Sequence, residues 1–432
     1  MDNSTADIPD FVPQLNIDVQ DEDGSPLGFI AVDRVVRDQC SGGIRMTHDV
    51  SPAEVRGLAN AMSWKFAFMN LPVGGAKSGI ICPADADNEE RSRRLALFGK
   101  KVGPLLRTFY SSGGDIGVGP AELAVVKQAA GLSTRERPGT QRSGYYTAFG
   151  VYVTITAWLQ AAGLQIIGAT AIIEGYGSVG QPLAQLLNAA GIRVTGISTI
   201  AGGLFNEEGI DLNALDALKD EHGDACVLHS TDATRLSPPD LLQQKATVLV
   251  PGARPWAINQ NNAGQLKCNA IIPASNIPVT PGATKMLEKA GVVIIPEFVS
   301  NSGGTFGGGL VNHGFSDAAA ERLMHRVYAA RLKGLLRRAE ADALTVRAAA
   351  ECISEENRER LERIASSKRA ALSATFERPH GLRRLWFRFA LGVFSTVYGL
   401  FGDKVQHLPD AFHAAAGEAI YNRAVSESFH MD

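Results

Sequence analysis

The sequence lacks any pair of cysteines spaced to hold a metal ion or to close a short disulfide loop. Its five cysteines stand far apart and form no CxxC pair: Cys40, Cys82, Cys226, Cys268 and Cys352. Such spacing is typical of reduced thiols in the cytoplasm rather than of a disulfide framework or a zinc site. The first residues, MDNSTADIPDF, are acidic and polar, which excludes a signal peptide. We therefore expect a soluble, cytoplasmic protein without a metal centre.

The chain also lacks a strong charge of either sign. Its 42 basic and 45 acidic residues give a formal net charge of −3, so no overall field would attract nucleic acid or an anionic membrane. Hydrophobic residues make up 45% of the sequence, which is ordinary for a globular protein. The length of 432 residues exceeds what one hydrophobic core usually serves, so we expect two or three domains.

One strongly apolar segment complicates this interpretation. Residues 384–401, RLWFRFALGVFSTVYGLF, carry only two charges, Arg384 and Arg388. The segment is near the lower length limit for a bilayer span, and Arg388 weakens it further. A buried helix that packs on the body or on another subunit is the favoured interpretation. The alternative is weak contact with a membrane or a partner through the region around Trp386.

Hydrophobic patterning divides the chain into three regions and predicts an α/β fold. Residues 1–143 mix short strands with a helix from Ser51 to Met69, in which Ser51 provides the cap and Pro52 the first position. Residues 144–305 alternate helices with apolar runs that have the length of buried parallel strands. The helices are expected at 146–161 and 178–190, and the strands at 170–173, 193–198, 247–250, 270–273 and 292–295. We predict a first domain with a mixed sheet, a doubly wound Rossmann-type domain, and a helical C-terminal region, residues 306–432, packing back on the first domain.

Two glycine clusters in the first region are predicted to form loops. They are residues 74–79, which surround Lys77, and residues 113–117, which surround Asp115. Glycines gathered around one polar residue indicate that the backbone approaches a ligand closely. Four arginines nearby are expected to be surface charges: Arg91, Arg93, Arg94 and Arg107.

A GxGxxG motif follows the strand predicted at 170–173 and opens the helix predicted at 178–190. Its residues are Gly175, Tyr176, Gly177, Ser178, Val179 and Gly180. Between a strand and a helix, this motif favours binding of a dinucleotide by the helix N-terminus, although a glycine-rich turn without a ligand is the alternative. The next strand ends in Ser198 and Thr199, with no carboxylate to hold a ribose hydroxyl. Both NAD and NADP therefore remain open.

The ordered motifs GGIRM, MSWKFA, LPVGGAKSG, GDIGVG, GYGSVG and NSGG together resemble the glutamate/leucine/phenylalanine/valine dehydrogenase family. The resemblance covers roughly residues 30–310. It implies an amino-acid dehydrogenase that uses NAD or NADP, with a substrate-binding and oligomerisation domain before the dinucleotide-binding domain. It also implies a homo-oligomer, and an active site between the two domains that closes by hinge motion around residues 140–150 and 300–315.

The resemblance also implies roles for individual residues. Lys65 resembles the lysine that binds the substrate α-carboxylate, Lys77 the catalytic lysine, and Asp115 the carboxylate that carries protons to and from the substrate nitrogen. Two of these residues have a plainer alternative: Lys65 could be a solvated surface charge, and Asp115 could be a turn residue. Further substrate contacts are implied for Ser41, Gly42, Gly43, Gly113, Asn301, Thr305 and Gly308. Further cofactor contacts are implied for Thr147, Asn276 and Asn301. Ser198 and Thr199 are candidate cofactor contacts because their hydroxyls, at the end of the second strand, could accommodate a 2′-phosphate.

Two positions depart from glutamate-specific members of that family. Ser41 stands where those members carry a lysine for the substrate side chain, and Gly308 stands where they carry a serine. An unpaired carboxylate in such a pocket would be costly, so we expect a large apolar or aromatic amino acid and not glutamate. The expected reaction is oxidative deamination of an L-amino acid to its 2-oxo acid and ammonia. The alternative is a cofactor-binding regulatory or scaffold protein that has lost catalysis.

Overall fold

A computed structural model describes residues 12–134, 142–312 and 314–373. Its contacts divide the chain into two compact units, each of which is described by itself. We call residues 142–308 and 321–351 the seven-strand unit. Residues 10–141, 309–320 and 352–432, so far as they are described, form the five-strand unit. The apolar segment 384–401, with Trp386, lies outside the described residues.

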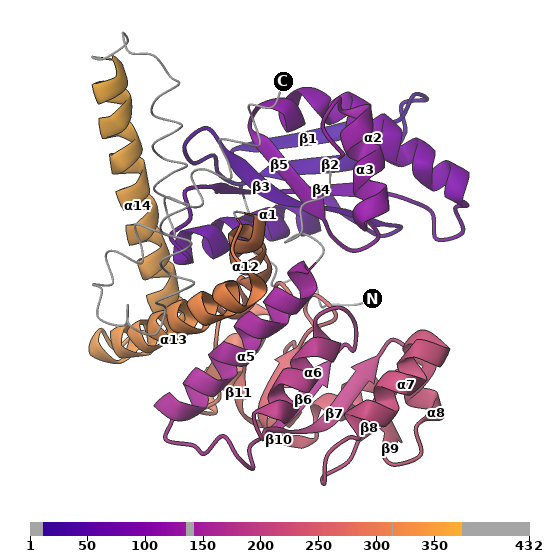
Figure 1. Cartoon of the computed structure of the whole chain (residues 1–432), viewed down its shortest axis with the longest axis vertical. Helices are drawn as coiled ribbons and strands as arrows, with labels where there is room; N and C mark the ends of the chain where they lie inside the picture. The colour runs from indigo at the N-terminus through magenta and orange to yellow at the C-terminus, as the bar shows by residue number, and fades with distance from the viewer. Residues whose placement is uncertain (1–11, 135–141, 313, 374–432) are drawn as a thin grey trace. The chain divides into compact units, whose positions relative to one another are not determined.

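The five-strand unit is built on a mixed sheet, as predicted (Figure 1). The strand order is β1-β2-β4-β3-β5, with β3 parallel to both β4 and β5, and β2 antiparallel to both β1 and β4. The elements in chain order are β1 (Leu15–Gln20), β2 (Pro26–Val32), β3 (Cys40–Thr47), α1 (Pro52–Phe68), β4 (Gly74–Ile81), α2 (Asn88–Thr108), β5 (Tyr110–Gly114) and α3 (Pro120–Ala129).

Helices cover both faces of this sheet because successive strand residues point to opposite sides. Ile30 of β2 lies in a core with Phe98 of α2 and Val126 of α3. Its neighbour Ala31 lies in a second cluster with Ala59 of α1. Helix α1 begins as the sequence predicts, with the Ser51 side chain accepting a hydrogen bond from the Glu54 amide.

The prediction that residues 74–79 and 113–117 form loops is wrong for all of the first segment and for the first two residues of the second. Residues 74–79 lie within β4, and Gly113 and Gly114 end β5. A Cβ on Gly75 would lie 2.2 Å from the Ser63 amide nitrogen and 2.3 Å from the Ala59 carbonyl oxygen of α1. The glycine is needed because a helix crosses the strand there, and not because the chain turns. Only Gly117, with φ of 75°, requires the conformational freedom of a turn.

The seven-strand unit holds the parallel sheet that the apolar runs predicted (Figure 1). The strand order is β12-β11-β10-β6-β7-β8-β9; neighbours are parallel from β12 to β7, and β8 and β9 join antiparallel. Its strands are β6 (Thr170–Glu174), β7 (Arg193–Thr199), β8 (Gly202–Phe205), β9 (Thr234–Leu236), β10 (Lys245–Pro251), β11 (Lys267–Ile271) and β12 (Val293–Ile294). Its helices are α5 (Ser143–Ala161), α6 (Gly180–Ala189), α7 (Leu212–His222), α8 (Cys226–His229), α9 (Pro238–Leu242), α10 (Pro281–Lys289) and α11 (Glu297–Ser300).

The strand order places a switch point between β6 and β10. Chain connections from these two neighbouring parallel strands lead to opposite halves of the sheet, since β7 lies beyond β6 and β11 beyond β10. In doubly wound sheets, ligands bind at the carboxyl ends of the strands at such a point. The GxGxxG residues follow β6 directly.

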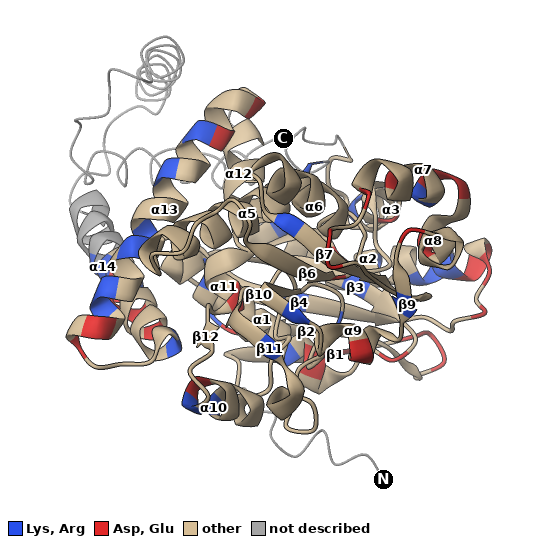
Figure 2. Ribbon diagram, turned by 90° about the horizontal axis from the view of Figure 1, so that it is seen from below, with Lys and Arg blue, Asp and Glu red and all other residues tan. Residues whose placement is uncertain are grey.

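Three helices carry the chain onward, α12 (Gly303–Asn312), α13 (Asp317–Ala341) and α14 (Val346–Ser373). Residues of both charge signs alternate along α14 (Figure 2). Within the five-strand unit, the Asn357 side-chain amide of α14 donates to the Ala67 carbonyl of α1, 3.1 Å away, and Leu361 is buried. The boundaries proposed from the sequence, at residues 143 and 305, stay a prediction. Among the described residues, no helix is long and apolar enough to cross a membrane.

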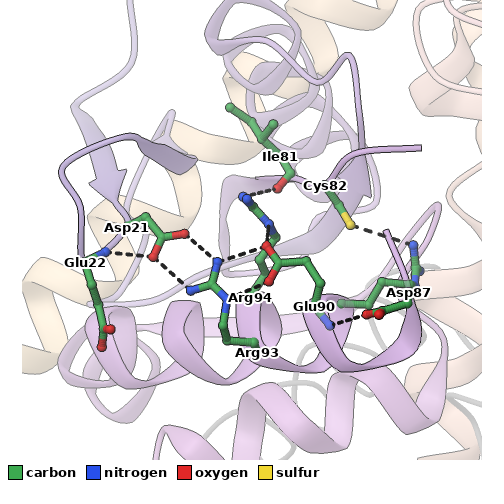
Figure 3. Close-up of polar contacts among 9 residues, drawn as sticks. Asp21, Glu22, Ile81, Cys82, Asp87, Glu90, Arg93 and Arg94 are labelled. Atoms are coloured by element: carbon green, nitrogen blue, oxygen red, sulfur yellow. Dashed lines mark hydrogen bonds and ion pairs between the residues drawn. The ribbon is translucent and has the colours of Figure 1, made fainter. Parts of the chain in front are cut away.

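Of the four arginines expected to be surface charges, Arg93 and Arg107 are exposed and Arg91 and Arg94 are partly buried; all four also tie α2 to its surroundings. Arg93 lies between the carboxylates of Asp21 and Glu90, and Arg94 contacts Glu90 and the Ile81 carbonyl (Figure 3). Arg91 donates to the Gly117 carbonyl at 3.2 Å, and Arg107 donates to the Ala130 carbonyl at 2.6 Å. These contacts fasten α2 to the sheet and to the loop after β5.

Candidate active site

The five-strand unit brings Lys77 and Asp115 into direct contact. Lys77 lies on β4 and Asp115 directly follows β5; β3 pairs in parallel with both strands, so their ends meet. The Lys77 Nζ lies 2.6 Å from the Asp115 Oδ2, and the lysine is only 3% exposed. A buried lysine and carboxylate at this distance form a charge-assisted hydrogen bond.

A second cation, Arg45 of β3, holds the same carboxylate. Its Nε lies 3.0 Å from the Asp115 Oδ2, and its Nη1 donates to Glu54 of α1. Burial alone would raise the pKa of Asp115, but the charges of Lys77 and Arg45 outweigh it and hold that pKa well below its usual range. Asp115 is therefore ionised at neutral pH.

The glycines of the GGIRM motif leave room at this pair. A Cβ on Gly43 would lie 3.0 Å from the Lys77 Nζ and 3.1 Å from the Asp115 Cβ, so any side chain there would press on both groups. A Cβ on Gly42 would collide with the Ala76 carbonyl of β4. Nothing lies within 4 Å of a Cβ on Gly113 of β5. The Ser41 hydroxyl donates to the Ser111 carbonyl at 2.9 Å.

Lys65 is buried in the last turns of α1, with 6% of its surface exposed. Its helix packs against β4, the strand of Lys77, through the close approach at Gly75. A lysine with so little exposure is not the solvated surface charge of the plainer interpretation.

The GxGxxG residues form a turn with a separate task for each glycine. Gly175 has a φ of 95°, which allows the chain to leave β6. A Cβ on Gly180 would lie 1.8 Å from the Gly175 carbonyl oxygen, so this glycine permits α6 to pack close to the turn. A Cβ on Gly177 would meet nothing within 4 Å, which leaves open space at the N-terminal end of α6. These are the three tasks that a pyrophosphate-binding turn requires.

A carboxylate from α7, Asp216, anchors this turn. It accepts hydrogen bonds from the Tyr176 hydroxyl at 2.6 Å and from the side-chain amides of Gln181 at 2.9 Å and Gln185 at 2.7 Å. Burial and the neighbouring carboxylate raise the pKa of Tyr176, so its hydroxyl remains a donor. Nothing in the sequence marked Asp216, because it lies some distance along the chain from the motif it supports.

The end of β7 offers hydroxyls, but one of them is already engaged. The Thr199 hydroxyl donates to the Asp224 carbonyl at 2.6 Å, and Ser198 is buried. The Glu174 carboxylate, at the end of β6, accepts from the Ala253 amide, and burial raises its pKa. This arrangement does not distinguish NAD from NADP.

Asn301 and Asn276 meet in the seven-strand unit. The Asn301 side-chain amide donates to the Asn276 Oδ1 at 3.0 Å and to the Ser275 carbonyl at 2.9 Å. Its own Oδ1 is buried and lacks a partner within the described part of the chain. An orphaned buried acceptor is costly and indicates a donor supplied by a ligand. Together with the open space at Gly177, it fits a bound dinucleotide.

The other predicted positions lie on α5 and α12. The Thr147 hydroxyl donates to the Ser143 carbonyl, and a Cβ on Gly304 would lie 2.6 Å from that hydroxyl oxygen. Thr305 bonds within its own helix, to the Ser302 carbonyl, and Gly308 lies on α12. The structure therefore assembles two clusters, Lys77 with Asp115 and Asn301 with Asn276. The sequence did not predict the contacts that Arg45, Glu54 and Asp216 make in the two units.

Most of the described chain matches models of a known protein family. Residues 139–360 match the family described as Glutamate/Leucine/Phenylalanine/Valine dehydrogenase, and residues 9–130 match the dimerisation domain of Glu/Leu/Phe/Val dehydrogenases. A glutamate dehydrogenase of Thermotoga maritima is 31% identical over 296 residues, which cover 64% of this chain and 70% of that protein.

Two solved structures share the fold. The hetero-hexameric glutamate dehydrogenase of Thermus thermophilus, in a Leu-bound form, aligns with a TM-score of 0.71 at 23% identity, over 83% of this chain and 90% of that one. The glutamate dehydrogenase of Peptoniphilus asaccharolyticus aligns with a TM-score of 0.63 at 21% identity, over 82% and 92%.

The chain combines a doubly wound sheet that carries a GxGxxG turn with a second unit that holds a buried lysine–carboxylate pair, and this combination is typical of a dinucleotide-dependent oxidoreductase. The chain belongs to the glutamate/leucine/phenylalanine/valine dehydrogenase family. It is an amino-acid dehydrogenase, an oxidoreductase of the CH–NH2 group that uses NAD or NADP.

The expectation that the chain is not a glutamate-type member is wrong. The relatives found by sequence and by structure are named glutamate dehydrogenases. The expectation rested on Ser41 and Gly308 alone. A buried carboxylate can be satisfied by hydroxyl and amide donors as well as by a lysine, as the amide of Ala253 does for Glu174 here. The loss of one cation therefore does not decide the substrate.

Proposed function

We propose that this chain oxidatively deaminates an L-amino acid to its 2-oxo acid and ammonia, and catalyses the reverse reductive amination, with Lys77 and Asp115 as its catalytic residues. The observation that carries the proposal is the buried 2.6 Å contact between the Lys77 Nζ and the Asp115 Oδ2. A buried pair of this kind, beside glycines that leave room for a ligand, is suited to moving protons rather than to stabilising the fold.

The dinucleotide would be held by the seven-strand unit. The amides of the Gly175–Gly180 turn and the N-terminus of α6 would bind the pyrophosphate, and the orphaned Asn301 Oδ1 would accept a hydrogen bond from the ligand. Thr147, Asn276, Ser198 and Thr199 are further candidate contacts. When bound, the nicotinamide accepts two electrons together with the hydrogen of the substrate Cα.

The side chains of the five-strand unit would handle the protons. Lys65 would bind the α-carboxylate of the substrate. Loss of the Cα hydrogen leaves an iminium, and Lys77 would activate the water that attacks its carbon and stabilise the oxygen of the carbinolamine. Asp115, ionised by its two cationic neighbours, would take the proton from the water and return it to the departing nitrogen. Before the Cα hydrogen leaves as hydride, Asp115 would also take a proton from the substrate ammonium. One water is consumed, and one ammonium and one further proton are released, so atoms and charge balance.

Glutamate is the first candidate substrate, because the relatives carry that name. Within the five-strand unit, Ser41, Gly42, Gly43 and Gly113 would form the side-chain end of the pocket. Thr305 and Gly308 stay candidate substrate contacts. Ser41 supplies a hydroxyl and Gly113 leaves open space, so apolar L-amino acids belong in the test as well.

We also propose that the chain works as an oligomer. Residues 9–130 match a dimerisation domain, and one relative is named a hetero-hexamer. Light scattering of the purified protein would give its subunit number. A monomer with full activity would contradict this part of the proposal.

The direct test mixes the purified chain with a panel of L-amino acids and either NAD or NADP, and follows formation of the reduced nicotinamide. Growth of the signal with at least one amino acid is expected, as is the reverse reaction with the 2-oxo acid and ammonium. No reaction in either direction would leave the alternative, a cofactor-binding protein without catalysis.

Replacing Lys77 by alanine tests the role of the pair. The variant is expected to lose about 10²–10⁴-fold in kcat, the usual range for a proton-transfer group, while its dissociation constant for the dinucleotide stays unchanged. Lys219, which pairs with Asp224 in the seven-strand unit, gives a matched Lys219→Ala control that should keep its turnover. A Lys77→Ala variant with wild-type kcat would remove Lys77 from the mechanism.

A further inference from the structure

Arg45 is the most constrained charge near the Lys77–Asp115 pair. Its side chain is 8% exposed and lies between two carboxylates, with the Nε directed to Asp115 and the Nη1 to Glu54. Glu54 stands in the first turn of α1 and Arg45 on β3, so the contact links the helix to the strand. An arginine buried to this degree, with both neighbours acidic, is held in one orientation.

The backbone that carries Asp115 is already fixed by other contacts. The Met46 amide donates to the Ile116 carbonyl at 2.8 Å, and Arg91 donates to the Gly117 carbonyl. A Cβ on Gly117 would lie 2.0 Å from the Met46 carbonyl oxygen, so the turn presses directly on β3. Besides a backbone hydrogen bond at Ile116, the direction of the Asp115 carboxylate is set by its side-chain contacts with Lys77 and Arg45.

Both cations that reach Asp115 do so through the same oxygen. The Lys77 Nζ and the Arg45 Nε both lie within 3.0 Å of Oδ2, and the side chain keeps 21% of its surface exposed. A guanidinium that is itself anchored prevents rotation of the carboxylate about its terminal bond. The accessible part of the carboxylate then keeps one direction.

We propose that Arg45, anchored by Glu54, is a positioning residue that fixes Oδ2 of Asp115 and thereby directs the remainder of that carboxylate toward the substrate nitrogen. The inference deepens the proposed function and rests on it. Arg45 touches neither substrate nor cofactor in this account, and acts only through Asp115.

The charges of the surrounding groups support a positioning role for Arg45 and a catalytic role for Asp115. Lys77 and Arg45 contribute two positive charges and Asp115 and Glu54 two negative ones, so the four charged groups sum to zero. Among the described residues, the buried Tyr110 also interacts with Asp115; burial raises the pKa of Tyr110, so its hydroxyl stays neutral. Without Arg45, the contact with Lys77 would be the remaining ion pair of Asp115 in the part of the chain that the structure describes, and the ammonium would be held more tightly by that carboxylate.

The test compares three variants with the wild type, using the best substrate from the panel. Arg45→Met removes both contacts, and we expect kcat to fall about 10- to 100-fold, the cost of misplacing a catalytic group by about 1 Å. KM for the dinucleotide should not change. Arg45→Lys keeps the charge but cannot reach both carboxylates, so kcat should fall less. Arg94→Met, which breaks contacts of a half-buried arginine in the same unit, should leave kcat unchanged.

A titration separates positioning from a merely structural role. Arg45→Met should raise the pKa of Asp115 by roughly one to three pH units, because an opposite charge in contact is lost, and so shift the acidic limb of kcat/KM to higher pH. Glu54→Gln should move that limb to lower pH or leave it in place, since it removes a negative charge. If the acidic limb of kcat/KM lies at the same pH in Arg45→Met and in the wild type, or if the two have the same kcat, the proposal is overturned.

A readout that needs no turnover distinguishes failure of this inference from failure of the proposed function. The carboxyl carbons of ¹³C-labelled aspartate are followed by NMR in the whole protein, with Asp115 assigned from an Asp115→Asn variant. The Asp115 signal should begin to titrate at higher pH in Arg45→Met than in wild type, even if no amino acid is oxidised. If Arg45→Met does not fold, the same comparison is made with Arg45→Lys, where an unchanged titration together with unchanged kcat contradicts the proposal.

Discussion

Two glycine-rich segments of this protein, residues 74–79 and residues 175–180, look alike in sequence and differ in what their glycines do. In β4 of the five-strand unit, Gly75 lies inside a strand, and its missing Cβ lets α1 cross at close range. In the turn after β6, Gly177 has open space around its missing Cβ. The first glycine makes room for another part of the protein, and the second leaves open space at the N-terminal end of α6, where the proposed dinucleotide would bind.

Glycines with these two functions can be distinguished by experiment. A glycine needed for packing should be tested by stability, whereas a glycine needed for ligand approach should be tested by affinity. The geometry makes this distinction quantitative, because the space around each absent Cβ is known. Substitutions in β4 should therefore lower the stability of the fold, whereas substitutions in the turn after β6 should lower the affinity for the dinucleotide.

The largest effect is expected for Gly75→Ala. Its new methyl group would lie 2.2 Å from the Ser63 nitrogen, and overpacking of this kind costs about 1–3 kcal/mol or more. The midpoint of chemical unfolding should fall accordingly. Gly113→Ala is the matched control, because it lies in the same sheet and its Cβ would meet nothing within 4 Å. Equal losses in both variants would show that the close approach of α1 is unimportant.

This contrast also explains where sequence-based prediction failed. Strand and helix positions in the seven-strand unit followed from the length of the apolar runs, as in β10 and α6. The segment around Lys77 was predicted as a loop, because glycines and a lysine mask the alternation of a strand. Whether a glycine faces a helix or solvent depends on contacts with residues distant in the sequence, here Ala59 and Ser63.

A smaller effect, on affinity alone, is expected for Gly177→Val. The side chain would occupy the open space at the start of α6, so the dissociation constant for NAD or NADP should rise at least about tenfold, or about 1.4 kcal/mol. The unfolding midpoint should stay near that of the wild type. Gly264→Val, at another open glycine of the same unit, should change neither quantity. A Gly177→Val variant that binds dinucleotide normally would mean that the ligand does not approach this turn.

For a similar reason, some residues of the candidate site could be predicted from the sequence and others could not. Lys77 and Asp115 could be named from the order of motifs, and the structure joins them at 2.6 Å. The supporting residues could not, because Glu54 and Asp216 are ordinary helix residues whose partners are set by the packing of their helices. The substrate was predicted least well, since the expectation rested on two positions, Ser41 and Gly308.

The smallest effect is expected for Tyr176→Phe, which separates the support of the nucleotide turn from the turn itself. The variant loses the hydrogen bond from the hydroxyl to Asp216, while Gln181 and Gln185 still bond to that carboxylate. Losing one bond to a charged group costs about 1.5–3 kcal/mol at most, and the two amides left in place should reduce that cost. We expect a loss of dinucleotide affinity below tenfold, measured by fluorescence titration, and a small fall in the unfolding midpoint. Asp216→Asn weakens all three bonds at once and should lower affinity more than Tyr176→Phe. If Asp216→Asn binds the dinucleotide as well as the wild type, the turn keeps its shape without α7, and the open space at Gly177 alone determines binding.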